Sequence, residues 1–192
     1  MGKVLRIIPA SDTDSDHELL ARCQAGQNQA FETLVRRHQG RLFSVAYRLM
    51  KDRDLAGELV QEALFRAFKK IGSHSGTGSV KGWLTRITVN TCLNEIRKRQ
   101  RLVFTEHSME SWLSADEKSD PARRVQAGEL RARVKGEVLQ LSPTRQAVLS
   151  LAALGYSYEE MAEALESSVS QVKSELFRAR KKLREKLKEY RS

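Results

Sequence analysis

Residues 141–191, LSPTRQAVLSLAALGYSYEEMAEALESSVSQVKSELFRARKKLREKLKEYR, decide the fold of the C-terminal part of this chain. Serine and proline at 142–143 place an N-cap residue before a proline at the first helical position. The segments SYEE (157–160) and SVSQ (168–171) are capping boxes, and Gly155 stands where the first helix should end. Short helices at this spacing, with a basic helix last, predict a helix-turn-helix and therefore contact with DNA.

The last helix of this segment is expected to be amphipathic. Its apolar stripe, which should face the core, comprises Val169, Val172, Leu176, Ala179 and Leu183. The residues expected to face outward near its start are Ser170, Gln171, Lys173, Ser174 and Arg178. Gln pairs with adenine edges and Arg or Lys with guanine, while other basic residues meet phosphate. A solvated charged face is the alternative interpretation, but the capped turn before the helix favours DNA contact.

Composition limits the possible classes of protein. The 192 residues allow one domain or two small ones, and 40% hydrophobic residues are enough for packed cores. The net charge of +10 favours a polyanionic partner. No apolar run approaches the roughly 18 residues of a spanning helix, and the start, MGKVLRIIPASDTDSD, lacks a full signal-peptide core. We therefore expect a cytoplasmic protein that is not inserted in a membrane.

Catalytic and metal-binding patterns are not found in the sequence. Cys23 and Cys92 form neither a disulfide framework nor a zinc site, and the histidines share no ligand spacing. A buried free thiol is the simpler interpretation of each cysteine, and a redox switch is the alternative. There is no Gly-rich phosphate loop, nucleophile elbow or recognisable pair of catalytic carboxylates. No metal or cofactor is expected.

The N-terminal part reads as a series of helices. Helical spacing and caps predict helices over residues 15–26, 28–50, 55–71 and 80–101, with a small polar loop at 73–79. The fold class is therefore all-α.

Charge and periodicity divide the chain into domains. We expect a flexible tail at residues 1–13, a helical domain at 14–101, a flexible linker at 102–120 and a helix-turn-helix domain at 121–192. A first helix of the second domain should run from just after Pro121 to about residue 140. The acidic residues of the linker are Glu106, Glu110, Asp116, Glu117 and Asp120.

A second polar constellation lies within WLTRITVNTCLNEIRKRQR (83–101). Asn90, Asn94, Arg97 and Lys98 share one helical face by their spacing. Amides and cations suit base edges and the backbone of nucleic acid, although exposed helix residues would look the same. The loop before this helix could accept an unstacked base. Trp83 is more often a core residue than a stacking platform.

The helix over 55–71 carries a different kind of face. Glu58, Gln61 and Glu62 lie opposite much of its apolar set. An acidic patch on a basic protein will not touch DNA, so this face is either solvated or docks on another protein.

In this order, the segments resemble a small bacterial sigma factor of the extracytoplasmic-function type. The matching stretches are AFETLVRRHQGRLFSVAYRLMKD (30–52), DLAGELVQEALFRAFKKI (54–71), GWLTRITVNTCLNEIRKR (82–99) and residues 141–185. A helix-turn-helix alone is shared by several families of regulators. The ordered set, interrupted by an acidic linker, is highly specific.

The resemblance implies roles for these segments. It places the polymerase clamp helices against Glu58, Leu59, Gln61 and Glu62. It assigns the C-terminal domain to the −35 element and the loop with the following helix to melting and reading the −10 element. The implied −10 residues are His74, Trp83, Asn90, Asn94, Arg97 and Lys98. Such a protein is not an enzyme, because polymerase does the chemistry, and it usually has an anti-sigma partner. The linker would thread toward the active-site cleft and the RNA exit path.

The chain departs from the family pattern at four positions. Glu58 stands where aspartate is commoner, His74 and Val80 where phenylalanines are frequent, and Glu175 where arginine is common. The base preference of the −10 pocket and the phosphate contacts near Glu175 are therefore expected to differ. The main alternative is a helix-turn-helix regulator that binds duplex DNA without core polymerase. A nucleic-acid enzyme would need a metal or acid–base cluster, which the sequence does not suggest.

Overall fold

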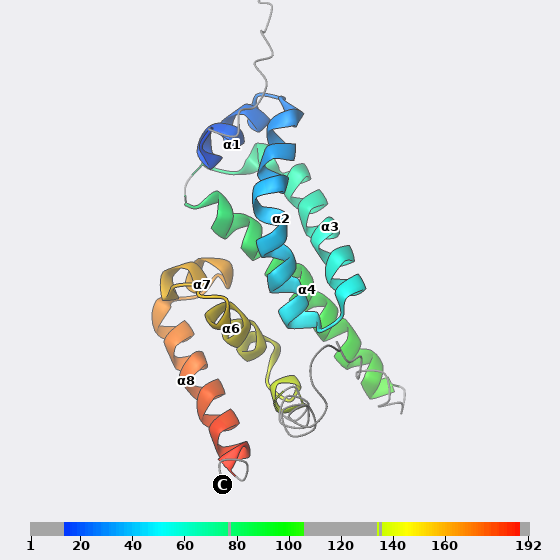
Figure 1. Ribbon diagram of the computed structural model, residues 1–192, viewed down its shortest axis with the longest axis vertical. Coiled ribbons are helices and arrows are strands. Elements are labelled where there is room, and N and C mark those ends of the chain that lie inside the picture. Colours follow the sequence, from blue (N-terminus) through cyan, green and yellow to red (C-terminus); the bar gives the residue numbers. More distant parts are fainter. Residues whose placement is uncertain (1–13, 77, 106–133, 135, 189–192) are drawn as a thin grey trace, which may run out of the picture.

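The computed structural model describes residues 14–76, 78–105, 134 and 136–188, and these residues form helices joined by turns (Figure 1). The all-α prediction is confirmed. The helices of the N-terminal part are α1 (Asp16–Gln24), α2 (Asn28–Met50), α3 (Arg53–Lys70) and α4 (Val80–Thr105), with a 3-10 turn η1 (Ile71–Ser73) after α3. The helices of the C-terminal part are α6 (Pro143–Ala153), α7 (Tyr158–Ala164) and α8 (Val169–Lys186).

Local caps account for where the N-terminal helices begin. The Ser15 hydroxyl accepts from Glu18 N, and the Glu18 carboxylate accepts from Ser15 N, so the expected capping box starts α1. The Asp52 carboxylate accepts from Leu55 N at 3.0 Å and starts α3. Lys51 closes α2 in the left-handed region, with φ 57°, which allows the sharp turn into α3.

The helix-turn-helix is formed as its sequence predicts. Capping boxes start α7 at Ser157 and α8 at Ser168, and Gly155 takes a positive φ of 77° in the turn after α6. Ser142 occupies the N-cap of α6 ahead of Pro143, but its side chain makes no capping hydrogen bond. The stripe of α8 faces inward, because Val172, Leu176 and Ala179 are buried.

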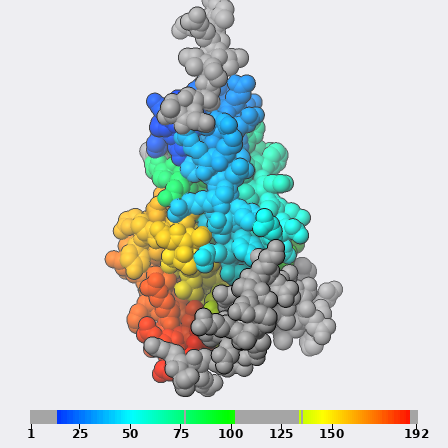
Figure 2. Space-filling model, viewed as in Figure 1, coloured from blue at the N-terminus to red at the C-terminus, as the bar shows by residue number. Residues whose placement is uncertain are grey.

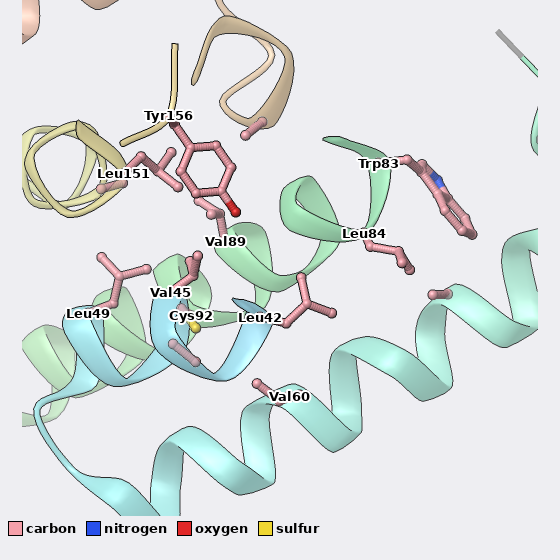
Figure 3. Close-up of a cluster of buried hydrophobic side chains, with 14 of the residues drawn as sticks. Leu42, Val45, Leu49, Val60, Trp83, Leu84, Val89, Cys92, Leu151 and Tyr156 are labelled. Carbon is pink, nitrogen blue, oxygen red and sulfur yellow. The ribbon is translucent and has the colours of Figure 1, made fainter. Parts of the chain in front are cut away.

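The two parts of the chain pack on each other. In the space-filling view, α6 and α7 lie directly against the N-terminal helices (Figure 2). One hydrophobic cluster includes Leu42 and Val89 from the first part and Leu151 and Tyr156 from the second, and these side chains meet in the interior (Figure 3). The sequence predicts the two cores but not this contact.

The prediction differs from the structure at the end of α4. This helix continues to Thr105, four residues beyond the expected end at Arg101. Residues 106–120 of the predicted linker and most of the helix expected after Pro121 lie outside the described residues; within it, residues 136–139 are helical. The predicted domain limits therefore stay a prediction.

Candidate nucleic-acid and polymerase interfaces

The outward residues predicted on α8 lie together near its N-terminal end. Ser170, Gln171, Lys173 and Arg178 are exposed, and Ser174 is half-buried. Helix α8 thus presents a polar and basic surface of the kind that enters a major groove in a helix-turn-helix.

Gln171 already has a structural partner at this surface. Its Oε1 accepts from Ser168 N at 3.1 Å and from the Ser167 hydroxyl at 2.9 Å. The side chain therefore holds the first turn of α8. The predicted capping box therefore uses Gln171 Oε1, which is the same oxygen that a contact with adenine would need.

Glu175 bridges two arginines on this surface. Its carboxylate lies 2.7 Å from Arg145 Nε on α6 and 3.0 Å from Arg178 Nη1. The hydrogen bond from Arg145, together with the charges of both arginines, lowers the pKa of Glu175 below its usual range. Arg178 is thus partly neutralised at the place where it was expected to meet DNA.

An exposed aromatic ring was missed by the sequence reading. Phe177 lies on α8 next to Arg178 and is 68% exposed. Helical spacing alone could have predicted this exposure, because an aromatic residue outside the 169/172/176/179 stripe of an amphipathic helix must face solvent or a partner.

The polar residues predicted on α4 also share a face. Asn90, Asn94, Arg97 and Lys98 are all exposed, and Arg97 Nη1 donates to Asn94 Oδ1 at 3.3 Å. The buried neighbours Val89, Cys92 and Leu93 anchor the opposite side of the helix. This arrangement leaves amides and cations on one solvent-facing strip.

The loop before α4 forms a hollow rather than a flat surface. It has a volume of about 300 Å³ and is lined by Lys70, Ser73, His74, Ser75, Trp83, Arg86 and Glu163. His74 stands edge-on to the Trp83 ring, with ring centroids 4.7 Å apart. Burial, together with the charge of Arg86, lowers the pKa of His74, so the imidazole is kept neutral near pH 7.

Trp83 belongs mainly to the core. Its side chain is 7% exposed and its indole turns toward the loop side of α4 (Figure 3). It supports His74 and leaves little ring face for stacking.

Three of the four residues predicted to dock on polymerase lie on the exposed side of α3. Glu58, Gln61 and Glu62 are exposed, but Leu59 is 6% exposed and packs in the core. Leu59 belongs with Ala56, Ala63 and Ala67 to the buried stripe of α3. The helical spacing of these residues in the sequence predicts this stripe.

Two phenylalanines extend this face. Phe65 is 59% exposed, Phe68 is 38% exposed, and the spacing from Glu58 through Gln61 and Glu62 places them on the same side of α3. The Lys69 ammonium lies 4.3 Å from the Phe65 ring centroid. An acidic strip that ends in exposed aromatic rings suits a protein partner better than solvent.

In the part of the chain that the structure describes, neither a reactive thiol nor a metal-binding cluster is found. Burial raises the pKa of the Cys23 thiol to about 11 and that of Cys92 to about 12. Both thiols are free and buried. Over the described ranges, no three His, Cys, Asp or Glu residues are placed to hold a metal ion. None of the helices that the structure describes is long and apolar enough to span a bilayer.

Comparison with known proteins places these surfaces in a family. Residues 34–102 match Sigma-70 region 2 and residues 132–183 match Sigma-70 region 4. The RNA polymerase sigma-H factor of Pseudomonas aeruginosa is 30% identical, over 87% of this chain and 91% of that protein. The ECF RNA polymerase sigma-E factor of Escherichia coli K12 is 31% identical, over 92% of this chain and 96% of that protein. The chain belongs to the extracytoplasmic-function sigma factors.

Two solved structures of similar proteins support the same family. The sigma factor RpoE from Bartonella quintana, in a complex with the anti-sigma factor NepR, is 27% identical with a TM-score of 0.62, over 82% of this chain and 96% of that chain. CnrH, in a complex with the cytosolic domain of CnrY, is 27% identical with a TM-score of 0.65, over 93% of this chain and 100% of that chain.

The matched regions of this sigma factor contain the surfaces described above. Region 2 spans α3, the α4 strip and all of the lining of the hollow except Glu163, and region 4 contains Glu163 and the exposed surface of α8. Sigma factors are not an enzyme family.

Proposed function

We propose that this sigma factor binds core RNA polymerase and directs initiation at promoters that carry paired −35 and −10 elements. The observation that carries the proposal is the presence, on one chain, of two separate polar helix surfaces, on α8 and α4, beside the acidic and aromatic face of α3. A regulator that only binds duplex DNA needs the first surface and has no use for the other two.

The α8 surface is assigned to the −35 element. Lys173 and Arg178 supply donors for guanine edges or phosphate, Ser170 and Ser174 lie beside them, and Phe177 offers an apolar contact for a thymine methyl group. Gln171 positions the helix start, and its free amide nitrogen remains a donor.

The hollow and the α4 strip are assigned to the −10 element. The strip of Asn90, Asn94, Arg97 and Lys98 offers amides and cations along one line, which suits a single strand and its phosphates. His74 borders the hollow at its head as a neutral donor or acceptor for an unstacked base.

The α3 face is assigned to the polymerase. Glu58 and Glu62, the latter paired with Arg66, give it acidic groups for a basic partner, Gln61 gives it an amide, and Phe65 gives it an apolar anchor. The clamp helices of the largest subunit are the family's site for this contact.

An anti-sigma factor is the expected regulator of this protein. Two structurally similar proteins were solved as complexes, with the anti-sigma factor NepR and with the cytosolic domain of CnrY. The sigma factor itself works where polymerase and chromosome lie, in the cytoplasm, and leaves the chemistry to polymerase.

Reconstituted transcription tests the proposal. Purified protein added to core polymerase should produce run-off transcripts from a subset of genomic fragments, and core alone should not. Phe65→Ala should reduce transcription through loss of core binding, with Phe177→Ala reducing it only on −35-dependent promoters. Absence of any complex with core at low salt, together with tight binding to duplex DNA, would favour the regulator instead.

A further inference from the structure

An acidic edge of the C-terminal part lies against the start of α4. It consists of Glu160 and Glu163 on α7 and Glu166 in the turn that follows. Glu160 pairs with Lys81, Glu163 Oε1 accepts from Ser79 N at 3.3 Å, and Glu166 Oε1 lies 3.4 Å from Arg86 Nη1. Each carboxylate therefore has its own donor at the start of α4.

The backbone of α4 is shaped to receive the middle carboxylate. A Cβ atom added at Gly82 would collide with the end of the Glu163 side chain, and one at Gly78 would lie 3.1 Å from Glu163 Oε1. Glu163 also lines the hollow with His74, Trp83 and Arg86. The acidic edge thus reaches the head of the surface that we assign to the −10 strand.

A buried aromatic residue fixes this arrangement. Tyr156, in the turn between α6 and α7, is buried, and its hydroxyl lies 3.2 Å from Thr85 Oγ1 on α4. The Arg41 guanidinium on α2 lies 4.3 Å from its ring centroid. The Tyr156 side chain lies beside Leu151 and Val89 (Figure 3). The contact between α7 and α4 is therefore anchored on an apolar base and carries its charges at the rim.

We infer that the acidic edge is an intramolecular competitor of the −10 strand, which covers the start of α4 in the free sigma factor. The inference rests on the proposed function, and it names the regulation of that same site. Carboxylates and phosphates use the same donors: Lys81, Arg86 and the amide groups at the N-terminus of α4. Both cannot occupy these donors at once, so the strand gains access only when α7 moves away.

The expected size of the effect follows from the exposure of the ion pairs. The side chains of the Arg86–Glu166 pair are 37% and 61% exposed. Pairs of this kind shift an equilibrium by about twofold to fivefold each. Neutralising Glu163 and Glu166 together should therefore raise the affinity of the free protein for single-stranded DNA by about fivefold.

Two kinds of variant test this inference. The double variant Glu163→Gln, Glu166→Gln weakens the edge but keeps Glu160 in its capping box. The matched control is Glu159→Gln, Glu185→Gln, which removes the same charge from exposed positions on α7 and α8. Gly82→Ala approaches the contact from the other side, because it displaces the Glu163 carboxylate and removes no charge.

The readouts are amide hydrogen exchange of the free protein and fluorescence anisotropy with a labelled, mixed-sequence single-stranded DNA. The Glu163/Glu166 variant and Gly82→Ala should exchange faster at residues 78–86 and 156–166 and bind the DNA more tightly than wild type. The Glu159/Glu185 control should match wild type in exchange and gain clearly less affinity than the Glu163/Glu166 variant.

Two results would overturn the inference. One is unchanged exchange in both test variants. The other is a gain in DNA affinity no larger than that of the control, which would assign the effect to net charge. Each leaves the proposed function standing if the wild type directs transcription with core polymerase. Conversely, wild-type failure in transcription, with competition intact, would overturn the proposed function and leave only the competition between the acidic edge and single-stranded DNA.

Discussion

Replacing Glu175 by Gln should lower the stability of the C-terminal domain and raise its affinity for DNA. Glu175 is 25% exposed and contacts both Arg145 and Arg178, which are 30% and 59% exposed. An ion pair at this exposure contributes about 0.2–1 kcal/mol. Gln keeps the shape and one hydrogen-bond acceptor, so loss of the charge should lower the free energy of unfolding by about 0.5–1 kcal/mol.

The effect on DNA has the opposite sign. Removing a negative charge beside the phosphates, and freeing Arg178 from its partner, should tighten duplex binding by about twofold to fivefold. If Arg178 then meets a phosphate, the slope of log affinity against log salt should steepen by about 0.9. Urea denaturation measures the first effect, and anisotropy with a −35 duplex at several salt concentrations measures the second.

The control for this substitution is Glu185→Gln. Glu185 lies on the same helix, 4.0 Å from Lys181, and has the same charge, but it has no contact with Arg145 or Arg178. Weaker binding by the Glu175 variant than by this control would refute the reasoning. That result would mean that Glu175 aims Arg178 at a base, so that the ion pair prepares the surface for DNA.

Further predictions concern individual residues. Leu59→Ala should lower the free energy of unfolding by about 2–4 kcal/mol through a core cavity, measured by urea denaturation, whereas Phe65→Ala should leave it unchanged and weaken core polymerase binding more than fivefold in a titration. Lys51→Gly should raise stability by about 0.5–1 kcal/mol in thermal unfolding, because its φ of 57° suits glycine. The hydrogen bond from Lys81 holds the pKa of Glu160 below its usual 4.5, so this carboxylate stabilises the fold fully above that pH and progressively less as pH falls below it. Glu160→Gln should flatten the acid limb of a stability–pH profile, and an unchanged limb would contradict the ion pair.

The elements of the fold were predictable where their causes are local. Ser15, Ser157 and Ser168 each find their capping partner three residues along the chain, so the sequence contains the whole interaction. The buried stripe of α8 follows from spacing for the same reason. Most predicted starts therefore agree with the structure to within a residue or two.

The docking face shows where reasoning from family motifs departs from geometry. Leu59 was carried over from the polymerase-binding motif of the family, although its own spacing with Ala56 and Ala63 places it inside. The same spacing, applied from Glu58, reaches Phe65 on the outside. The helical period alone would have placed Phe65 in the predicted docking face instead of Leu59.

The contact between the two parts of the chain could not be read from the sequence. Tyr156 and Thr85 are 71 residues apart, and the intervening chain includes the acidic segment 102–120. The local sequence around Tyr156 does not predict a contact with Thr85, and the sequence around Thr85 does not predict one with Tyr156. Glu166 also lies beyond the end of α7, so helical spacing does not place it beside Glu160 and Glu163.

The ion pairs at the contact between α7 and α4 are exposed enough to be compatible with the proposed competition. The side chains of the Arg86–Glu166 pair are 37% and 61% exposed and those of the Lys81–Glu160 pair 32% and 34%, so each pair contributes about 1 kcal/mol or less. Beneath them, Tyr156 and Leu151 belong to the same hydrophobic cluster as Val89. In the competition that we infer, the free energy of binding polymerase and promoter DNA separates α7 from α4, a contact whose ion pairs are individually weak.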